Sequence, residues 1–159
     1  MTPQSRRAFT ILELVLTLLL MAASAAVAIQ LYFGQSTVTL QRAAELLGED
    51  LSIARQLAAA HESLVHIHFD ETGYKVTDSS GRALLHPRTG REFIRDYSRD
   101  AVFEGVELDL FRTSAGKPLL FQPNGLPNSG GEVYLSMGND TRHVYLMPTG
   151  VVEIATPVQ

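Results

Sequence analysis

Residues 1–34 read MTPQSRRAFTILELVLTLLLMAASAAVAIQLYFG, and this stretch decides how the whole chain is organised. The 20 residues from 14 to 33 include no Asp, Glu, Lys or Arg. In a helix, about 20 residues span the ~30 Å of a bilayer's hydrocarbon core. Arg6 and Arg7 precede the run, and basic residues stay on the cytoplasmic side of a membrane. The pattern predicts a single membrane-spanning helix with the rest of the chain outside the cytoplasm.

Three kinds of N-terminal signal share this general pattern. A cleaved secretory signal would be cut after the small residues Ala26-Val27-Ala28, and a twin-arginine signal would use Arg6 and Arg7. Neither signal needs Glu13, a carboxylate that costs about 2.5–3.5 kcal/mol at the centre of a bilayer and less near its edge. We therefore favour a third kind of signal, in which Glu13 has a role.

The stretch Arg6-Arg7-Ala8-Phe9-Thr10-Ile11-Leu12-Glu13-Leu14 resembles the leader of type IV pilins and of type II secretion pseudopilins. In that family a short basic leader is removed after a small residue, and the Phe that follows becomes N-methylated. The resemblance implies that a prepilin peptidase and methyltransferase cuts between Ala8 and Phe9 and methylates Phe9. The family usually has Gly before the cut, so the extra methyl group of Ala8 is compatible with slower processing.

The resemblance also implies a role for Glu13, which is the fifth residue after the expected cut. A buried carboxylate persists where a partner is supplied, and in this family the partner is the amino terminus of a neighbouring subunit. Glu13 and the amino group of Phe9 are therefore the expected assembly residues. The alternative is that Glu13 only reaches toward the lipid headgroups.

A second helical pattern follows the uncharged run. Apolar residues recur at spacings of three and four, at positions 40, 43, 44, 47, 51, 54, 57 and 58. This stripe predicts an amphipathic helix packed on a globular head. No proline lies between Pro3 and Pro87, so we expect a nearly continuous helix from about residue 9 to about residue 60.

Beyond residue 60 the pattern is typical of short strands. The β-branched and aromatic runs 64–69 and 74–77 flank a turn sequence and predict a hairpin. Further strands are expected at 106–112, 118–122, 132–137, 143–147 and 151–154. The polar, Arg-rich residues 79–99 are expected to form a loop, with room for a short edge element.

These patterns predict an α+β chain in which a long N-terminal helix, membrane-spanning in its first half, packs on a small antiparallel β-sandwich head. Four segments are expected along the chain. They are a leader at 1–8, a transmembrane or filament helix at 9–33, an amphipathic helix at 34–60 and a β-rich periplasmic head at 61–159.

The last third of the chain strengthens the resemblance. The segments Leu120-Phe121-Gln122-Pro123-Asn124-Gly125, Glu132-Val133-Tyr134-Leu135, Arg142-His143-Val144-Tyr145-Leu146 and Pro148-Thr149-Gly150-Val151-Val152 resemble the head of the H-type pseudopilins, which are grouped with the minor pilins called fimbrial T and U. The resemblance implies a minor pseudopilin of a type II secretion system. A type IV minor pilin in pilus assembly or DNA uptake is the alternative, and an exported soluble periplasmic protein is a distant third.

The family resemblance also implies partners and a location. The expected partners are other pseudopilins or pilins, the prepilin peptidase, the inner membrane and secreted cargo. We expect the chain to cross the bacterial inner membrane once, with its N-terminus in the cytoplasm and its head in the periplasm.

Other chemistry finds little support in the sequence. The chain has no Cys, which excludes disulfides, thiolate catalysis and Cys-based zinc sites. It also lacks the G-x-S-x-G, H-E-x-x-H, P-loop and G-x-G-x-x-G motifs, so we expect neither an enzyme nor a cofactor. His66 and His68 alternate onto one face of a strand near His61, but a metal would need a further ligand such as Asp70, and we expect no metal site.

Arginines at positions 82, 88, 91, 95 and 99 are the best argument for nucleic-acid binding. Against this role, the formal net charge is -4, and Glu92, Asp96 and Asp100 interleave with the arginines. We expect Arg95 and Arg99 to pair with these local carboxylates. Nucleic acid is therefore not an expected partner.

Overall fold

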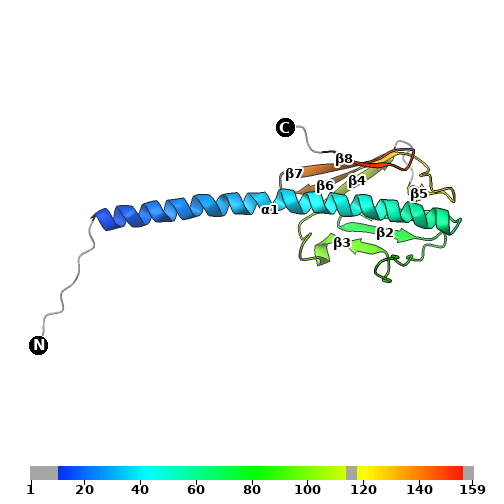
Figure 1. Ribbon diagram of the computed structural model, residues 1–159, viewed down its shortest axis with the longest axis horizontal. Helices are drawn as coiled ribbons and strands as arrows, with labels where there is room; N and C mark the ends of the chain where they lie inside the picture. Colours follow the sequence, from blue (N-terminus) through cyan, green and yellow to red (C-terminus); the bar gives the residue numbers. More distant parts are fainter. Residues whose placement is uncertain (1–10, 114–117, 156–159) are drawn as a thin grey trace, which may run out of the picture. The chain divides into compact units, whose positions relative to one another are not determined.

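The computed structural model describes residues 11–113 and 118–155, without the side chains of residues 26–36 and 109–113. The chain divides into two compact units, Met1–Gln35 and Ser36–Gln159. The first part of helix α1 (Ile11–Ala60) belongs to the first unit. The second unit comprises the rest of α1 and the described strands (Figure 1).

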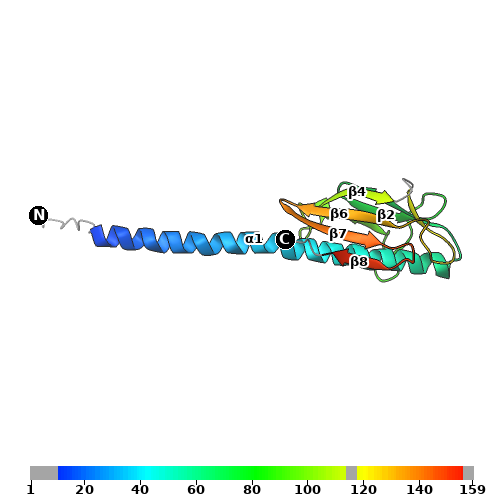
Figure 2. The same ribbon diagram turned by 90° about the horizontal axis from the view of Figure 1, so that it is seen from above.

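The strands of the second unit form two antiparallel sheets. The elements are β1 (Val65–Asp70), β2 (Gly73–Thr77), β3 (Ile94–Asp96), the 3-10 helix η1 (Tyr97–Arg99), β4 (Glu107–Thr113), β5 (Leu119–Phe121), β6 (Gly131–Met137), β7 (Asp140–Leu146) and β8 (Val152–Ala155). Sheet 1 has the strand order β3-β2-β1-β5, and sheet 2 has the order β4-β6-β7-β8. Figure 2 shows the strands of sheet 2 side by side.

The β1–β2 hairpin and its neighbour β3 fit together closely. Asp70 pairs with Gly73 across the turn, and its side chain accepts a hydrogen bond from the backbone N–H of Thr72 at 3.0 Å. A Cβ atom at Gly73 would lie 1.9 Å from the backbone oxygen of Arg95. Only glycine therefore allows β3 to approach β2 at this position.

The part of α1 beyond residue 36 packs against both sheets. In Figure 1, β2 and β3 lie on one side of it, and β6, β7 and β8 lie on the other. The stripe residues are buried at Leu40, Ala43, Ala44, Leu47, Leu51, Ala54 and Ala58, and Leu57 is partly buried. The predicted apolar stripe is therefore confirmed as the face that α1 turns to the core.

The expected α+β class, with an N-terminal helix and antiparallel sheets, is confirmed. The seven strands expected from the sequence are found, with ends within about three residues of those predicted. The edge element of the Arg-rich segment is β3. Among the described residues, we find no helix that combines the length and the apolar character needed to cross a membrane.

Candidate functional site

The described N-terminal part of α1 exposes apolar side chains in every direction. Between residues 11 and 21, nine large apolar side chains are between 47% and 84% exposed. They are Ile11, Leu12, Leu14, Val15, Leu16, Leu18, Leu19, Leu20 and Met21. Because they include consecutive positions, they surround the helix and do not form one stripe. A helix that is apolar all round is normally buried, either in a membrane or among other helices.

Two hydroxyl side chains in this part of α1 donate hydrogen bonds within the helix. The hydroxyl of Thr17 donates to the backbone oxygen of Leu14 at 2.9 Å, and that of Ser24 donates to the oxygen of Leu20 at 2.7 Å. These hydroxyls therefore need no water as a partner. Glu13 lies in the first turn of α1, where the positive end of the helix dipole favours a carboxylate.

The other N-terminal residues predicted as functional lie outside the described part of the chain. These residues are Arg6, Arg7, Ala8 and Phe9, and Glu13 is the predicted site residue that the structure describes. Cleavage after Ala8, methylation of Phe9 and the pairing of Glu13 remain predictions.

The head contains a buried charge cluster that the sequence did not predict. The side chain of Asp50 on α1 is fully buried. Its Oδ2 atom accepts hydrogen bonds from the Tyr74 hydroxyl at 2.7 Å and from Nε of Arg95 at 2.7 Å. Its Oδ1 atom lies 3.3 Å from Nε2 of His86. Asp50 thus joins α1 to β2, to β3 and to the segment between them.

The electrostatics of this cluster favour an ion pair between Asp50 and Arg95. The hydrogen bond to Asp50 raises the pKa of Arg95, even though burial acts in the opposite direction. Burial first, and then the neighbouring Tyr97 and Asp50, raise the pKa of Tyr74 well above its ordinary value. Tyr74 therefore stays a neutral hydrogen-bond donor to the buried carboxylate.

The sequence does contain one signal for the burial of Asp50. Position 50 lies three residues after Leu47 and four before Ala54, so it falls on the buried stripe. A carboxylate at a stripe position predicts a buried polar contact. Its partners His86 and Arg95 belong to the polar segment 79–99, which is predicted to form a loop, so the sequence could not identify them.

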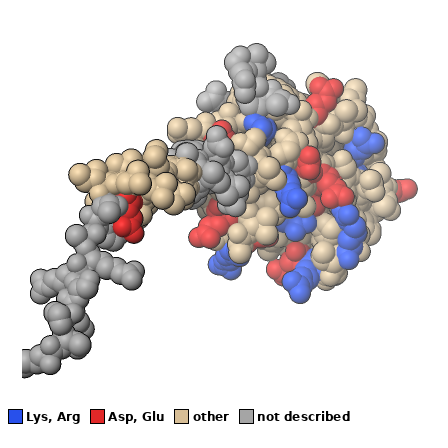
Figure 3. All heavy atoms as spheres, turned by 60° about the vertical axis from the view of Figure 1, so that its left-hand side comes forward, with Lys and Arg blue, Asp and Glu red and all other residues tan. Residues whose placement is uncertain are grey.

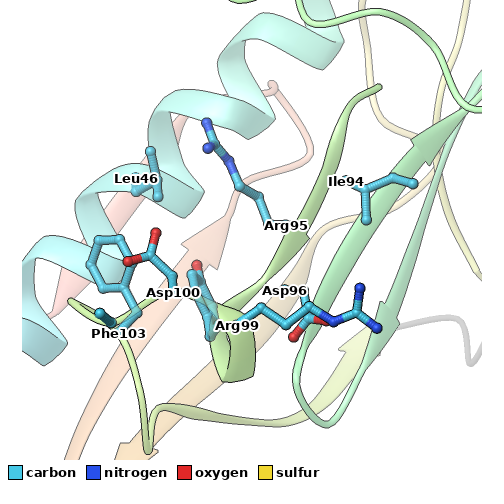
Figure 4. A pocket seen from close by; sticks show the side chains of 9 residues that line it. Leu46, Ile94, Arg95, Asp96, Arg99, Asp100 and Phe103 are labelled. Carbon is cyan, nitrogen blue, oxygen red and sulfur yellow. The ribbon is translucent and has the colours of Figure 1, made fainter. Parts of the chain in front are cut away.

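The prediction that Arg95 pairs with a local carboxylate is wrong. Arg95 reaches across to Asp50 because β3 pairs with β2 and its arginine side chain extends toward α1, as Figure 4 shows. The local pairing expected for Arg99 is confirmed, since its Nε lies 3.0 Å from Oδ2 of Asp96.

Most of the other segment arginines also have carboxylate partners. Arg82 lies 3.0 Å from Asp78, and Arg88 pairs with Glu49 of α1. On the face of the head drawn in Figure 3, basic and acidic side chains are interleaved and form no continuous basic patch. This arrangement gives little support to nucleic-acid binding.

A pocket of about 410 Å³ lies where β3 and η1 approach α1. Figure 4 shows Arg95 extended toward α1, Arg99 beside Asp96, and Phe103 near Leu46. Both arginines are already engaged by carboxylates. We therefore assign no ligand to this pocket.

His66 and His68 lie next to each other on β1, as the sequence predicts, with ring centroids 6.3 Å apart. Nε2 of His68 lies 3.2 Å from the hydroxyl of Thr77. Burial, Lys75 and His66 lower the pKa of His68. Within the described residues, no group of three or more metal-binding side chains is found.

Comparison with known proteins identifies the fold. No family model matches the chain, and no curated protein sequence matches it. The structure is similar to the type IV minor pilin FimU of Pseudomonas aeruginosa (strain PAO1), with a TM-score of 0.51 and 19% identity over 74% of this chain and 88% of that chain. It is also similar to the minor pseudopilin EpsH of the type II secretion system of Vibrio cholerae, with a TM-score of 0.52 and 12% identity over 76% of this chain and 96% of that chain.

These similarities confirm the resemblance at the level of the fold. The chain has the fold of minor pilins and minor pseudopilins, with a helix against two antiparallel sheets. The two TM-scores are nearly equal, so the fold is as similar to that of the type IV minor pilin as to that of the type II secretion pseudopilin.

Proposed function

We propose that this chain is a structural, non-enzymatic subunit of a pilin-like filament, and specifically a minor pseudopilin of a type II secretion system. The observation that supports this role best is the all-round apolar surface of α1 between Ile11 and Met21. The fold similarity to EpsH adds support. In this role, the head faces other pseudopilins and secreted cargo.

The exposed apolar surface makes assembly energetically favourable. Burying a Leu, Ile, Val or Met side chain contributes about 1.5–3 kcal/mol relative to leaving it in water. The nine exposed apolar side chains between Ile11 and Met21 therefore strongly favour a bilayer or a bundle of helices over water. We infer that the segment lies in the inner membrane first and in the filament core after assembly.

The membrane part of this proposal rests on the sequence. The uncharged run covers residues 14–33, whereas described side chains stop at residue 25 and resume at residue 37. Arg6 and Arg7 would hold the N-terminus in the cytoplasm, and the head would lie in the periplasm.

Glu13 would direct each subunit to its place in the filament. A prepilin peptidase would cut between Ala8 and Phe9, and the methylated amino group of Phe9 would pair with Glu13 of a neighbouring subunit. In an apolar environment this pair is strong, because little water is present to screen the two charges. The uncharged helices would then align in a fixed register.

The test replaces Glu13 by Ala and uses Thr17→Ala as the matched control on the same helix. The Glu13→Ala protein should remain in the membrane fraction but be absent from purified filaments, whereas Thr17→Ala should behave as the unaltered chain. Mass spectrometry of the mature protein should show a methylated N-terminal Phe9. Normal incorporation of Glu13→Ala, or a mature chain that begins at Ile29, would contradict the proposal.

The alternative is a type IV minor pilin, which the similarity to FimU supports equally well. Deletion of the gene in its own host separates the two roles. A pseudopilin is needed for the release of folded secreted proteins, and its loss should leave surface pili intact. If the chain is a minor pilin, its loss should abolish surface pili and leave the release of folded secreted proteins intact.

A further inference from the structure

The outer face of sheet 2 bears an unusual group of side chains. Val133 and Leu135 of β6 and Val144 and Leu146 of β7 are buried in the core. Because side chains alternate along a strand, the residues between them point away from the core. Figure 2 shows β6 and β7 at the centre of this sheet, between β4 and β8.

Four of these outward residues form what we call the carboxylate–aromatic cluster, namely Glu132, Tyr134, His143 and Tyr145. Glu132 stands opposite Tyr145, and Tyr134 stands opposite His143, in the register of β6 and β7. Nδ1 of His143 lies 3.0 Å from Oε1 of Glu132. The rings of Tyr134 and His143 meet edge to face with centroids 4.5 Å apart, and those of His143 and Tyr145 are 6.1 Å apart. The carboxylate is thus surrounded by aromatic rings.

The carboxylate of this cluster is negatively charged and accessible. Burial acts to raise the pKa of Glu132, but hydrogen bonds from Tyr134, Tyr145 and His143 outweigh it and lower that pKa. The side chains of Glu132 and His143 are 26% and 31% exposed. The cluster therefore presents an ionised oxygen acceptor beside partly exposed aromatic rings.

The surroundings of the cluster are acidic as well. Glu153 of β8 stands next to Tyr145 in the register, and Glu107 of β4 stands next to Ser136. Among the outward residues of sheet 2 whose side chains are described, none is Lys or Arg. The described charges of this face therefore favour a cationic group.

We propose that the carboxylate–aromatic cluster is a docking site for an arginine side chain of a different protein subunit. A guanidinium group is planar, so it can donate a hydrogen bond to the remaining lone pair of Glu132 while it stacks on a tyrosine ring. Tyrosine and arginine are also the residues that most often dominate binding energy in protein interfaces. This inference concerns the head alone and does not depend on the role of α1.

A different protein is a better source of the arginine than a second copy of this chain. Four of the five arginines between residues 82 and 99 pair with carboxylates of their own head. Arg91, the fifth, takes part in none of the ion pairs of the described residues. Within the same chain, Arg112 stands opposite Glu132 in the register of β4 and β6. Its side chain lies outside the described residues, so the test includes its removal.

The test is an NMR titration of the full chain in zwitterionic detergent micelles. The probe is N-acetyl-arginine methylamide, and the uncharged isostere N-acetyl-citrulline methylamide is its control. The ring signals of Tyr134, His143 and Tyr145 should shift saturably with the arginine probe alone. Glu132→Gln should weaken the apparent affinity by about fivefold or more, and Glu153→Gln, which removes the same charge from the same face, should change it by less than about twofold.

Several results would overturn the proposal. These are an absence of saturable shifts, equal shifts with the citrulline probe, or equal losses in Glu132→Gln and Glu153→Gln. Binding that occurs only in Arg112→Ala would show that the chain fills the site itself. Self-association that Glu132→Gln abolishes, measured by sedimentation, would replace the different subunit by a second copy.

Discussion

Asp50 of α1 and Arg95 of β3 are joined by a hydrogen bond of 2.7 Å between Oδ2 and Nε, although 45 residues separate them in the sequence. The Asp50 side chain has no exposed surface, and that of Arg95 is 31% exposed. An ion pair in such a position fixes which part of the chain covers the helix, because either charge would be costly without the other. The pair explains why the Arg-rich segment lies against α1.

Replacement of Asp50 by Ala should destabilise the head by about 3 kcal/mol, because it leaves Arg95 and the hydroxyl of Tyr74 without their acceptor. Glu49→Ala is the matched control. Glu49 is the adjacent residue and pairs with Arg88 at the surface, where an ion pair contributes about 0–1 kcal/mol. Urea unfolding of the full chain in detergent measures both values, and equal losses would contradict the buried role of Asp50.

The tyrosines of this region should resist ionisation. Burial raises the pKa of Tyr97 and that of Tyr74, so the folded state favours their neutral forms. The stability that this provides is complete below about pH 10, the ordinary pKa of tyrosine, and is lost as the pH rises further. In an alkaline titration followed by ultraviolet absorbance, these two tyrosines should ionise only when the protein unfolds. Reversible ionisation of all five tyrosines near pH 10 would contradict the packing.

Most of the fold could be predicted from the sequence, and the reason is local. Spacing alone predicts which residues are buried in the stripe from Leu40 to Ala58 and in the alternating runs of β1 and β2. The strands near the C-terminus are bounded by glycine-containing turns, which further define them. These signals need no knowledge of distant residues.

The buried cluster could not be predicted in the same way. In the sequence, Asp50 is separated from its partner His86 by 36 residues and from its partner Arg95 by 45 residues. An arginine near three acidic residues is expected to pair with one of them. Only the pairing of β3 with β2 places Arg95 against the helix instead.

Asp78 should keep its charge to an unusually low pH. Its carboxylate accepts hydrogen bonds from the Ser80 hydroxyl and from the backbone N–H groups of Ser80 and Arg82. These hydrogen bonds lower the pKa of Asp78 to about 2, although desolvation acts to raise it. A lowered carboxylate pKa stabilises the folded state above the ordinary pKa near 4, and this contribution is lost as the pH falls toward 2. A carbon-13 titration of the carboxyl groups should show Asp78 among the last to protonate. In Ser80→Ala its midpoint should move up toward the ordinary value, and an unchanged midpoint would contradict this assignment.

Gly73→Ala should be strongly destabilising. The new Cβ atom would lie 1.9 Å from the backbone oxygen of Arg95, and a backbone atom cannot move away without separating β3 from β2. The loss should extend to the Asp50–Arg95 pair, so we expect more than about 3 kcal/mol. Gly81→Ala is the control, because its Cβ would meet no atom within 4 Å and only its φ of 83° is unfavourable, at about 1–2 kcal/mol. Similar losses in the two variants would show that β3 is not held against β2.

Gly48→Ala should have the opposite effect and stabilise the head. Gly48 lies inside α1, where glycine costs about 0.5–1 kcal/mol relative to alanine because it loses more backbone freedom on folding. The added methyl group would lie 3.4 Å from Cγ1 of Val152 and 3.8 Å from Cδ1 of Ile154, which are ordinary contact distances to β8. The substitution therefore adds apolar contact between the helix and sheet 2 without requiring either to move. A rise of a few degrees in the midpoint of thermal unfolding is expected. A fall would mean that β8 packs on α1 more tightly than these distances indicate.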